Sequence, residues 1–216
     1  MAAVLRALQG GIESMYRVET DLDVCDFLVG GDRNGWEVER TPREQLLIKQ
    51  GDGEMQLGLF VDERTIENLT LNDPGRRLDA GNLQDFLLAV EGVSHFVYLV
   101  HRARADRPVS AVELELQAEV DKYLVALLVT WNQDPDGNPP EDLRRRLFSE
   151  ISFAGDLSRE ERDRYQLANS AADSYAASLE ERFLKVRNVD EMLAEARRFY
   201  RKGLAEKLEH ITQLAA

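Results

Sequence analysis

Residues 123–129 read YLVALLV, a stretch that is apolar without interruption. A helix that is apolar on every side is buried on every side. The helix that contains this stretch is predicted to begin after Pro108, with Ser110 as its N-cap, and to end near Trp131. The sequence therefore predicts a central core helix around which the other elements pack.

The segment before this helix, residues 82–101, is also predicted to be helical. Leu83, Phe86 and Val90 lie at helical spacing. Its second half, residues 93–101, has two interpretations, because a short apolar run does not distinguish a buried strand from a buried helix. A valine recurs there at every third or fourth position, so the helix is the favoured interpretation.

Residues 1–81 are predicted to form an acidic N-terminal segment that mixes helix and strand. Its first helix is expected over residues 2–18. A β-hairpin is expected over residues 45–61, where two apolar runs flank Gly51-Asp52-Gly53-Glu54. Asp-Gly suits such a turn because glycine accepts the positive φ that the turn requires. Asp62 is then expected to cap a short helix.

Residues 157–216 predict a long antiparallel helical hairpin. Ser158 and Glu161 have the spacing of a capping box, which starts a first helix that is expected to reach about Lys185. Asn188 is expected to start a second helix that continues to about Leu214. With a helical core over residues 82–156, the chain is predicted to be one continuous globular unit of α+β class, predominantly helical, with a small N-terminal β-hairpin element packed on the core.

Composition and charge narrow the classes of function. The chain has 216 residues, of which 44% are hydrophobic and 31% charged, a net charge of −13 and one cysteine, Cys25. All of the acidic excess lies in residues 1–156, because residues 157–216 carry equal numbers of acidic and basic residues. Acidic surfaces repel nucleic acids, and no run approaches the roughly 18 apolar residues of a membrane span. We expect a cytoplasmic protein with neither nucleic acid nor membrane as partner.

One candidate site is a divalent-metal centre formed by Glu91, His95, Glu115 and Glu119. Glu91 and His95 are four residues apart, and so are Glu115 and Glu119, so each pair shares a helix face. Carboxylates and imidazoles on facing helices hold transition metals in helical bundles, although the usual Glu–His spacing there is three residues. The alternative is that His95 is a packing residue and that the acidic side chains of the next helix form a solvent-exposed face, namely Glu113, Glu115, Glu119 and Asp121.

A second candidate is a calcium loop after the central helix. Asn132, Asp134 and Asp136 place oxygen ligands at alternate positions, and Gly137 follows them, as at the start of a calcium-binding loop. The position of the bidentate glutamate is occupied by Leu143. The alternative is an ordinary turn rich in proline, aspartate and glycine.

The leading hypothesis is a non-catalytic protein, a regulator or scaffold, that acts through contact with a protein partner or by self-association as a homodimer through its C-terminal helices. The sequence contains no Gly-x-Ser-x-Gly, Walker or Gly-x-Gly-x-x-Gly motif, and no cofactor is expected. Tyr165, Leu167, Phe199 and Leu214 lie off the main apolar stripes and are expected to need cover. The alternative is a metal-dependent helical-bundle enzyme that uses the four candidate metal ligands.

Overall fold

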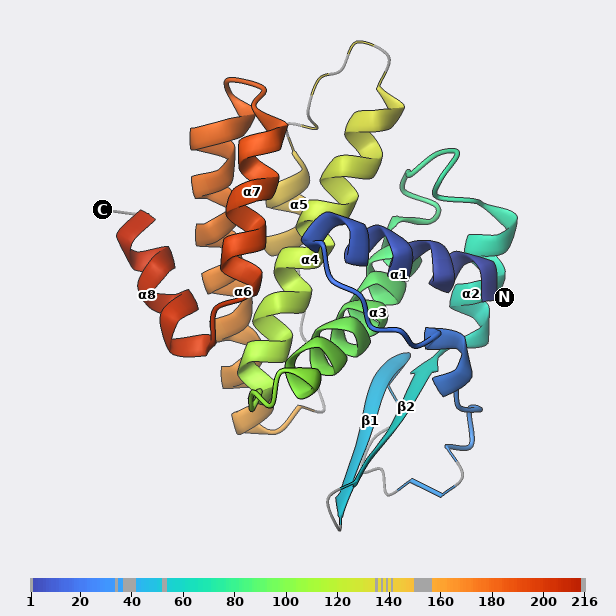
Figure 1. Ribbon diagram of the computed structural model, residues 1–216. Coiled ribbons are helices and arrows are strands. Elements are labelled where there is room, and N and C mark those ends of the chain that lie inside the picture. Colours follow the sequence, from blue (N-terminus) through green and yellow to red (C-terminus); the bar gives the residue numbers. More distant parts are fainter. Residues whose placement is uncertain are drawn as a thin grey trace.

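Helix α4 (Ala111–Gln133) runs through the middle of the molecule, and α3 (Leu83–Arg104) and α6 (Arg159–Leu179) pack along it (Figure 1). Leu124 and Leu127, from the stretch that predicted this helix, are at most 1% exposed. Burying a leucine side chain of this kind contributes about 1.5–3 kcal/mol. The prediction of a central core helix is confirmed, but burial on every side is not, because Val125, Leu128 and Val129 are only half-buried.

The computed structural model describes residues 2–33, 35–36, 42–51, 54–134, 136, 138, 140, 142–149 and 157–214. The other elements are, in chain order, α1 (Ala2–Tyr16), the 3-10 helix η1 (Val24–Phe27), β1 (Glu44–Gly51), β2 (Glu54–Val61), α2 (Glu63–Leu71), α5 (Leu143–Phe148), the π-helical turn η2 (Glu180–Leu184), α7 (Val189–Tyr200) and α8 (Leu204–Leu214). The fold is the predicted α+β class, mostly helical with a small N-terminal hairpin.

Strands β1 and β2 form the predicted hairpin. They pair antiparallel, with Glu44 opposite Val61 at one end and Gly51 opposite Glu54 at the other. The turn residues Asp52 and Gly53 lie outside the described residues. The open end of the hairpin contacts α3, so Glu44 enters the interior at the point where the strand meets the helix.

Helix α3 includes residues 93–101, so the alternative of a buried strand there is wrong. The helix is long enough to cross a membrane, and an 18-residue window in it has a mean hydropathy of 1.3. Its neighbours bury 67% of that window, as they do for the core helix of a folded protein. Length and composition alone are weak evidence for a membrane span.

The C-terminal helices differ from the prediction in one respect. The capping box of Ser158 and Glu161 is present at the start of α6. The second helix does not continue to residue 214, because it ends at Tyr200 and α8 starts at Leu204 in a new direction (Figure 1). Gly203 lies at this break, and its N–H donates to the Glu206 carboxylate at 2.9 Å. Glycine is a poor helix former, which explains why the chain bends here.

A buried carboxylate joins α1, α3 and α4. Asp121 of α4 is completely buried. It accepts hydrogen bonds from the hydroxyl of Tyr16, from the Ser94 hydroxyl at 2.5 Å and from the Gln117 amide at 2.8 Å. Burial raises its pKa to about 6, and these three donors limit the rise. The three donors replace the water that this carboxylate loses on folding.

Helix α8 adds a buried cation to the same network. The ammonium of Lys207, completely buried, donates to the Tyr98 hydroxyl at 2.9 Å and to the Gln117 side-chain oxygen at 2.5 Å. Burial lowers its pKa from 10.5 to about 7, and the nearby Glu113 and Asp121 offset only part of that effect. Lys207 therefore ties α8 to α3 and α4 through polar contacts.

We predict that Leu124→Ala lowers the free energy of unfolding by about 2–5 kcal/mol, because it leaves a cavity in the centre of α4. Urea denaturation monitored by circular dichroism measures the change. Leu71→Ala serves as the control, since the Leu71 side chain is 83% exposed and should leave stability within about 0.5 kcal/mol. Equal effects at the two positions would contradict the central placement of α4.

We also predict that Lys207 contributes a gain in stability as the pH increases from about 7 to 9. Over this range Lys207 keeps its proton in the unfolded chain, whereas the folded protein has released it. At this residue the unfolded state therefore binds more protons, and the contribution of Lys207 grows by about 1.4 kcal/mol for each pH unit. Urea denaturation of the unmodified protein and of Lys207→Met across the range measures it as the difference between the two slopes. The exposed Lys185→Met should keep the slope of the unmodified protein, and equal slopes for Lys207→Met and the unmodified protein contradict this assignment.

Candidate functional site

A pocket of about 520 Å³ opens between β1, α3, α4 and α6. This volume lies within the range of small-molecule sites, about 300–1,000 Å³. Part of its wall is apolar and is formed by Leu46, Leu88 and Leu114. The rest is polar and carries several charged side chains, so the pocket combines an apolar wall with charged groups.

Gly92 of α3 determines how closely the hairpin approaches this pocket. A Cβ atom at position 92 would lie 2.9 Å from Cγ of Glu44 and 3.1 Å from Cδ1 of Leu59. Such contacts are too short for a side chain at that position. The missing side chain thus allows β1 to lie against α3. This contact brings the Glu44 carboxylate to the pocket wall beside His95, which belongs to α3 as Gly92 does.

Four side chains of alternating charge follow one another along the wall: Glu44, His95, Glu115 and Arg164, called here the charged chain. The His95 Nδ1 atom lies 3.6 Å from Glu44 Oε1, and His95 Nε2 lies 3.5 Å from Glu115 Oε2. The Arg164 Nε atom lies 3.9 Å from Glu115 Oε1. All three distances exceed a normal hydrogen bond, about 2.7–3.2 Å, but remain close enough for strong electrostatic attraction.

The charged chain alters the pKa values of its members. Burial lowers the pKa of the His95 imidazole, but the carboxylates of Glu115 and Glu44 outweigh it and raise that pKa well above its usual value. Burial raises the pKa of Glu44 to about 7, although His95 opposes the rise. At neutral pH His95 is therefore a cation, and Glu44 is close to the midpoint of its titration.

The other two predicted metal ligands, Glu91 and Glu119, are held by a lysine. The ammonium of Lys122 donates to Glu91 at 3.0 Å and to Glu119 at 2.6 Å. Glu91, His95 and Glu115 line the pocket, whereas Glu119 is not among its lining residues. Across the described ranges, no group of three or more His, Cys, Asp or Glu is arranged to hold a metal ion. The metal centre stays a prediction.

The alternative of a solvent-exposed face on α4 is wrong. Glu115 is 9% exposed and Asp121 is completely buried. A charge pattern typical of a solvated helix face lies inside the protein because other elements supply compensating groups, such as the imidazole of His95 and the ammonium of Lys122. His95 itself is buried between two carboxylates rather than among apolar side chains only.

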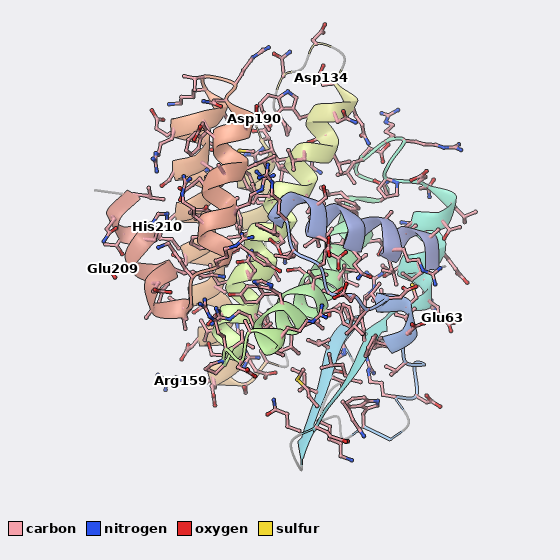
Figure 2. All side chains as sticks on the ribbon, viewed as in Figure 1. Glu63, Asp134, Arg159, Asp190, Glu209 and His210 are labelled. Carbon is pink, nitrogen blue, oxygen red and sulfur yellow. The ribbon has the colours of Figure 1, made fainter. Side chains whose placement is uncertain are left out.

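The predicted calcium loop follows the C-terminal end of α4, remote from the pocket. Figure 2 shows Asp134 at this end of the helix, away from Arg159 at the start of α6. The carboxylate of Asp134 accepts a hydrogen bond from the backbone N–H of Asp136 at 2.8 Å, the pattern of an aspartate turn. Asn132 belongs to the last turn of α4, and Gly137 lies outside the described residues. The hydrogen bond agrees with the alternative of an ordinary turn, and calcium binding stays a prediction.

The apolar side chains that suggested self-association are partly covered within one chain. Phe199 is completely buried and stacks on Tyr175, with ring centroids 4.0 Å apart, so the expectation that it needs cover from a partner is wrong. Tyr165 lines the pocket, and Leu214 is half-buried. Leu167 is 46% exposed. Self-association through the C-terminal helices stays a prediction, which light scattering after size exclusion measures directly.

Sequence reasoning missed Glu44, Gln45 and Arg164 as pocket residues. Glu44 and Gln45 stand at the start of a strand whose apolar residues dominate its pattern, and only the contact with α3 turns them inward. Arg164 lies at a position that also suits an exposed ion pair within α6. No local signal in the sequence distinguishes these side chains from surface residues.

No protein-family model, curated protein or solved structure matches this chain significantly.

We predict that Glu44 titrates near neutral pH and that His95→Gln raises its pKa further, because this variant removes the nearest cation from a buried carboxyl. Carbon-13 NMR of the glutamate side chains measures the midpoint, and Glu44→Gln identifies the resonance by its disappearance. A midpoint near the usual value of 4.5 would contradict the burial of this carboxyl.

Proposed function

We propose that this protein binds a small organic molecule in the pocket between β1, α3, α4 and α6. The observation that carries the proposal is a set of buried polar atoms on residues of the pocket wall. They have no hydrogen-bond partner in the part of the chain that the structure describes, and they are Oε1 of Glu44, Oε1 of Gln45, Nε2 of His95 and Nε of Arg164. Each such atom costs about 1–3 kcal/mol when it is buried without a partner.

The four unpartnered atoms are a reason to infer a ligand because native proteins satisfy nearly all of their buried polar groups. A molecule in the pocket would supply those partners once the side chains turn toward it, because the four atoms are covered as they stand. Its carbon skeleton would contact Leu46, Leu88 and Leu114. A few polar groups set in an apolar wall are the usual composition of a specific small-molecule site.

The proposed role is binding rather than catalysis, which agrees with the hypothesis of a non-catalytic regulator. The carboxylates beside His95 raise the pKa of its imidazole well above the usual value, which favours the charged form, a hydrogen-bond donor and a poor base. A fixed donor of this kind suits recognition of a ligand.

We predict that Ala111→Trp abolishes ligand binding. Ala111 is an exposed residue at the pocket wall, so the indole ring would fill part of the pocket without disturbing the charged chain. Thermal shift with a panel of amino acids, polyamines, nucleotides, sugar phosphates and dicarboxylates measures binding. At saturating concentration a ligand should raise Tm by about 5 °C or more in the unmodified protein.

Ala105→Trp provides the matched control, because Ala105 is exposed but does not line the pocket. This variant should respond to the ligand as the unmodified protein does. The proposal fails if no compound in the panel raises Tm, or if the rise is the same in Ala111→Trp.

A further inference from the structure

Residues of the pocket wall carry two hydrogen-bond acceptors and two hydrogen-bond donors without partners. This equal division indicates the class of ligand. Building on the proposed function, we infer that the ligand is a small zwitterion that carries both an ammonium group and a carboxylate, as a free amino acid does. In this assignment Glu44 and Gln45 receive the ammonium, and Arg164 and His95 receive the carboxylate.

The four unpartnered atoms divide equally by chemistry and by position. The two on β1, Oε1 of Glu44 and Oε1 of Gln45, accept hydrogen bonds. The two on helices α3 and α6, His95 Nε2 and Arg164 Nε, donate them when the imidazole is charged. A ligand that satisfies all four atoms must carry donors toward the strand and acceptors toward the helices.

The burial of these groups makes both requirements strict. The side chains of Glu44 and His95 are 8% and 9% exposed, and that of Arg164 is 23% exposed. Water has little access to the first two, so a ligand must replace it. Charge-assisted hydrogen bonds in such surroundings are roughly twice as strong as neutral ones.

The wall carries charges of both signs in nearly equal number, which disfavours a strongly charged ligand. Its carboxylates and its cationic side chains are Glu44, Glu91, Glu115 and Glu161 against Arg43, His95 and Arg164. The adjoining Lys122 donates to both Glu91 and Glu119. A zwitterion leaves this balance unchanged.

Simple ions fit the wall less well. A phosphate or a dicarboxylate would leave the acceptors of Glu44 and Gln45 without donors. A polyamine would leave the donors of His95 and Arg164 without acceptors. A buried polar atom that stays unpaired is destabilising. The zwitterion alone of these classes pairs each ligand charge with an opposite charge on the wall.

Isothermal titration calorimetry with the twenty common amino acids tests the inference on the full chain. For the amino acid that binds best, the matched probes are its amide, which lacks the carboxylate, and its des-amino acid, which lacks the ammonium. We expect each probe to bind about tenfold to hundredfold more weakly, because each loses one charge-assisted contact. This comparison needs no variant of the protein.

Two variants assign the ends of the ligand. Glu44→Gln should weaken binding of the amino acid and remove the difference in affinity between the amino acid and the des-amino probe. Arg164→Gln should remove the difference in affinity between the amino acid and its amide. Glu54→Gln and Arg159→Gln are the matched controls, since Glu54 is exposed on β2 and the Arg159 side chain is 96% exposed. Circular dichroism verifies that every variant is folded.

The possible outcomes separate the inference from the proposed function. If no amino acid binds, or if the amide or the des-amino probe binds as tightly as the amino acid, the inference is wrong. The proposed function survives that result if another compound of the panel raises Tm and Ala111→Trp abolishes the effect. If both variants leave the preferences for the probes unchanged, the assignment of the ligand ends to Glu44 and Arg164 is wrong.

Discussion

Helices α3 and α4 bury acidic side chains on both sides of their contact, and neighbouring elements supply polar groups around them. A buried carboxylate without a partner costs several kcal/mol. On one side, α1 and α8 bring Tyr16 and Lys207 to the network around Asp121. On the other side, α6 brings Arg164 beside Glu115, and β1 places a further carboxylate, Glu44, beside His95. Charge compensation therefore helps to fix the positions of these elements.

The two sides are compensated to different degrees. Around Asp121 the polar groups lie within hydrogen-bond distance of one another, although the nearby Tyr200 hydroxyl and Arg102 Nε have no partner within the described ranges. Along the pocket wall the neighbours are 3.5–3.9 Å apart, and polar atoms remain without partners within the described ranges. The first arrangement stabilises the fold, and the second is suited to a ligand. Both use the same two helices, so the fold holds the pocket on a rigid base.

Short patterns in the sequence correctly predicted the helices and strands that such patterns determine. The apolar run at residues 123–129, the two apolar runs of the hairpin and the capping box at Ser158 each correspond to an element found in the structure. The bend at Gly203 was missed because a glycine within a helical pattern is often tolerated. The burial of Glu115 and Asp121 could not be predicted, because their compensating groups come from distant segments. For the same reason the sequence did not predict that Glu44 lines the pocket.

The bend at Gly203 has a consequence for how the protein matures during translation. The ribosome releases α1, α3 and α4 well before α8, so Asp121 and Glu113 emerge before the ammonium of Lys207 that later lies near them. The hydroxyl of Tyr16, the hydroxyl of Ser94 and the amide of Gln117 can already satisfy Asp121 at that stage. The arrival of α8 then adds the buried ammonium of Lys207, which donates to Tyr98 and Gln117. The last polar link of the interior is therefore made by the last helix to be synthesised.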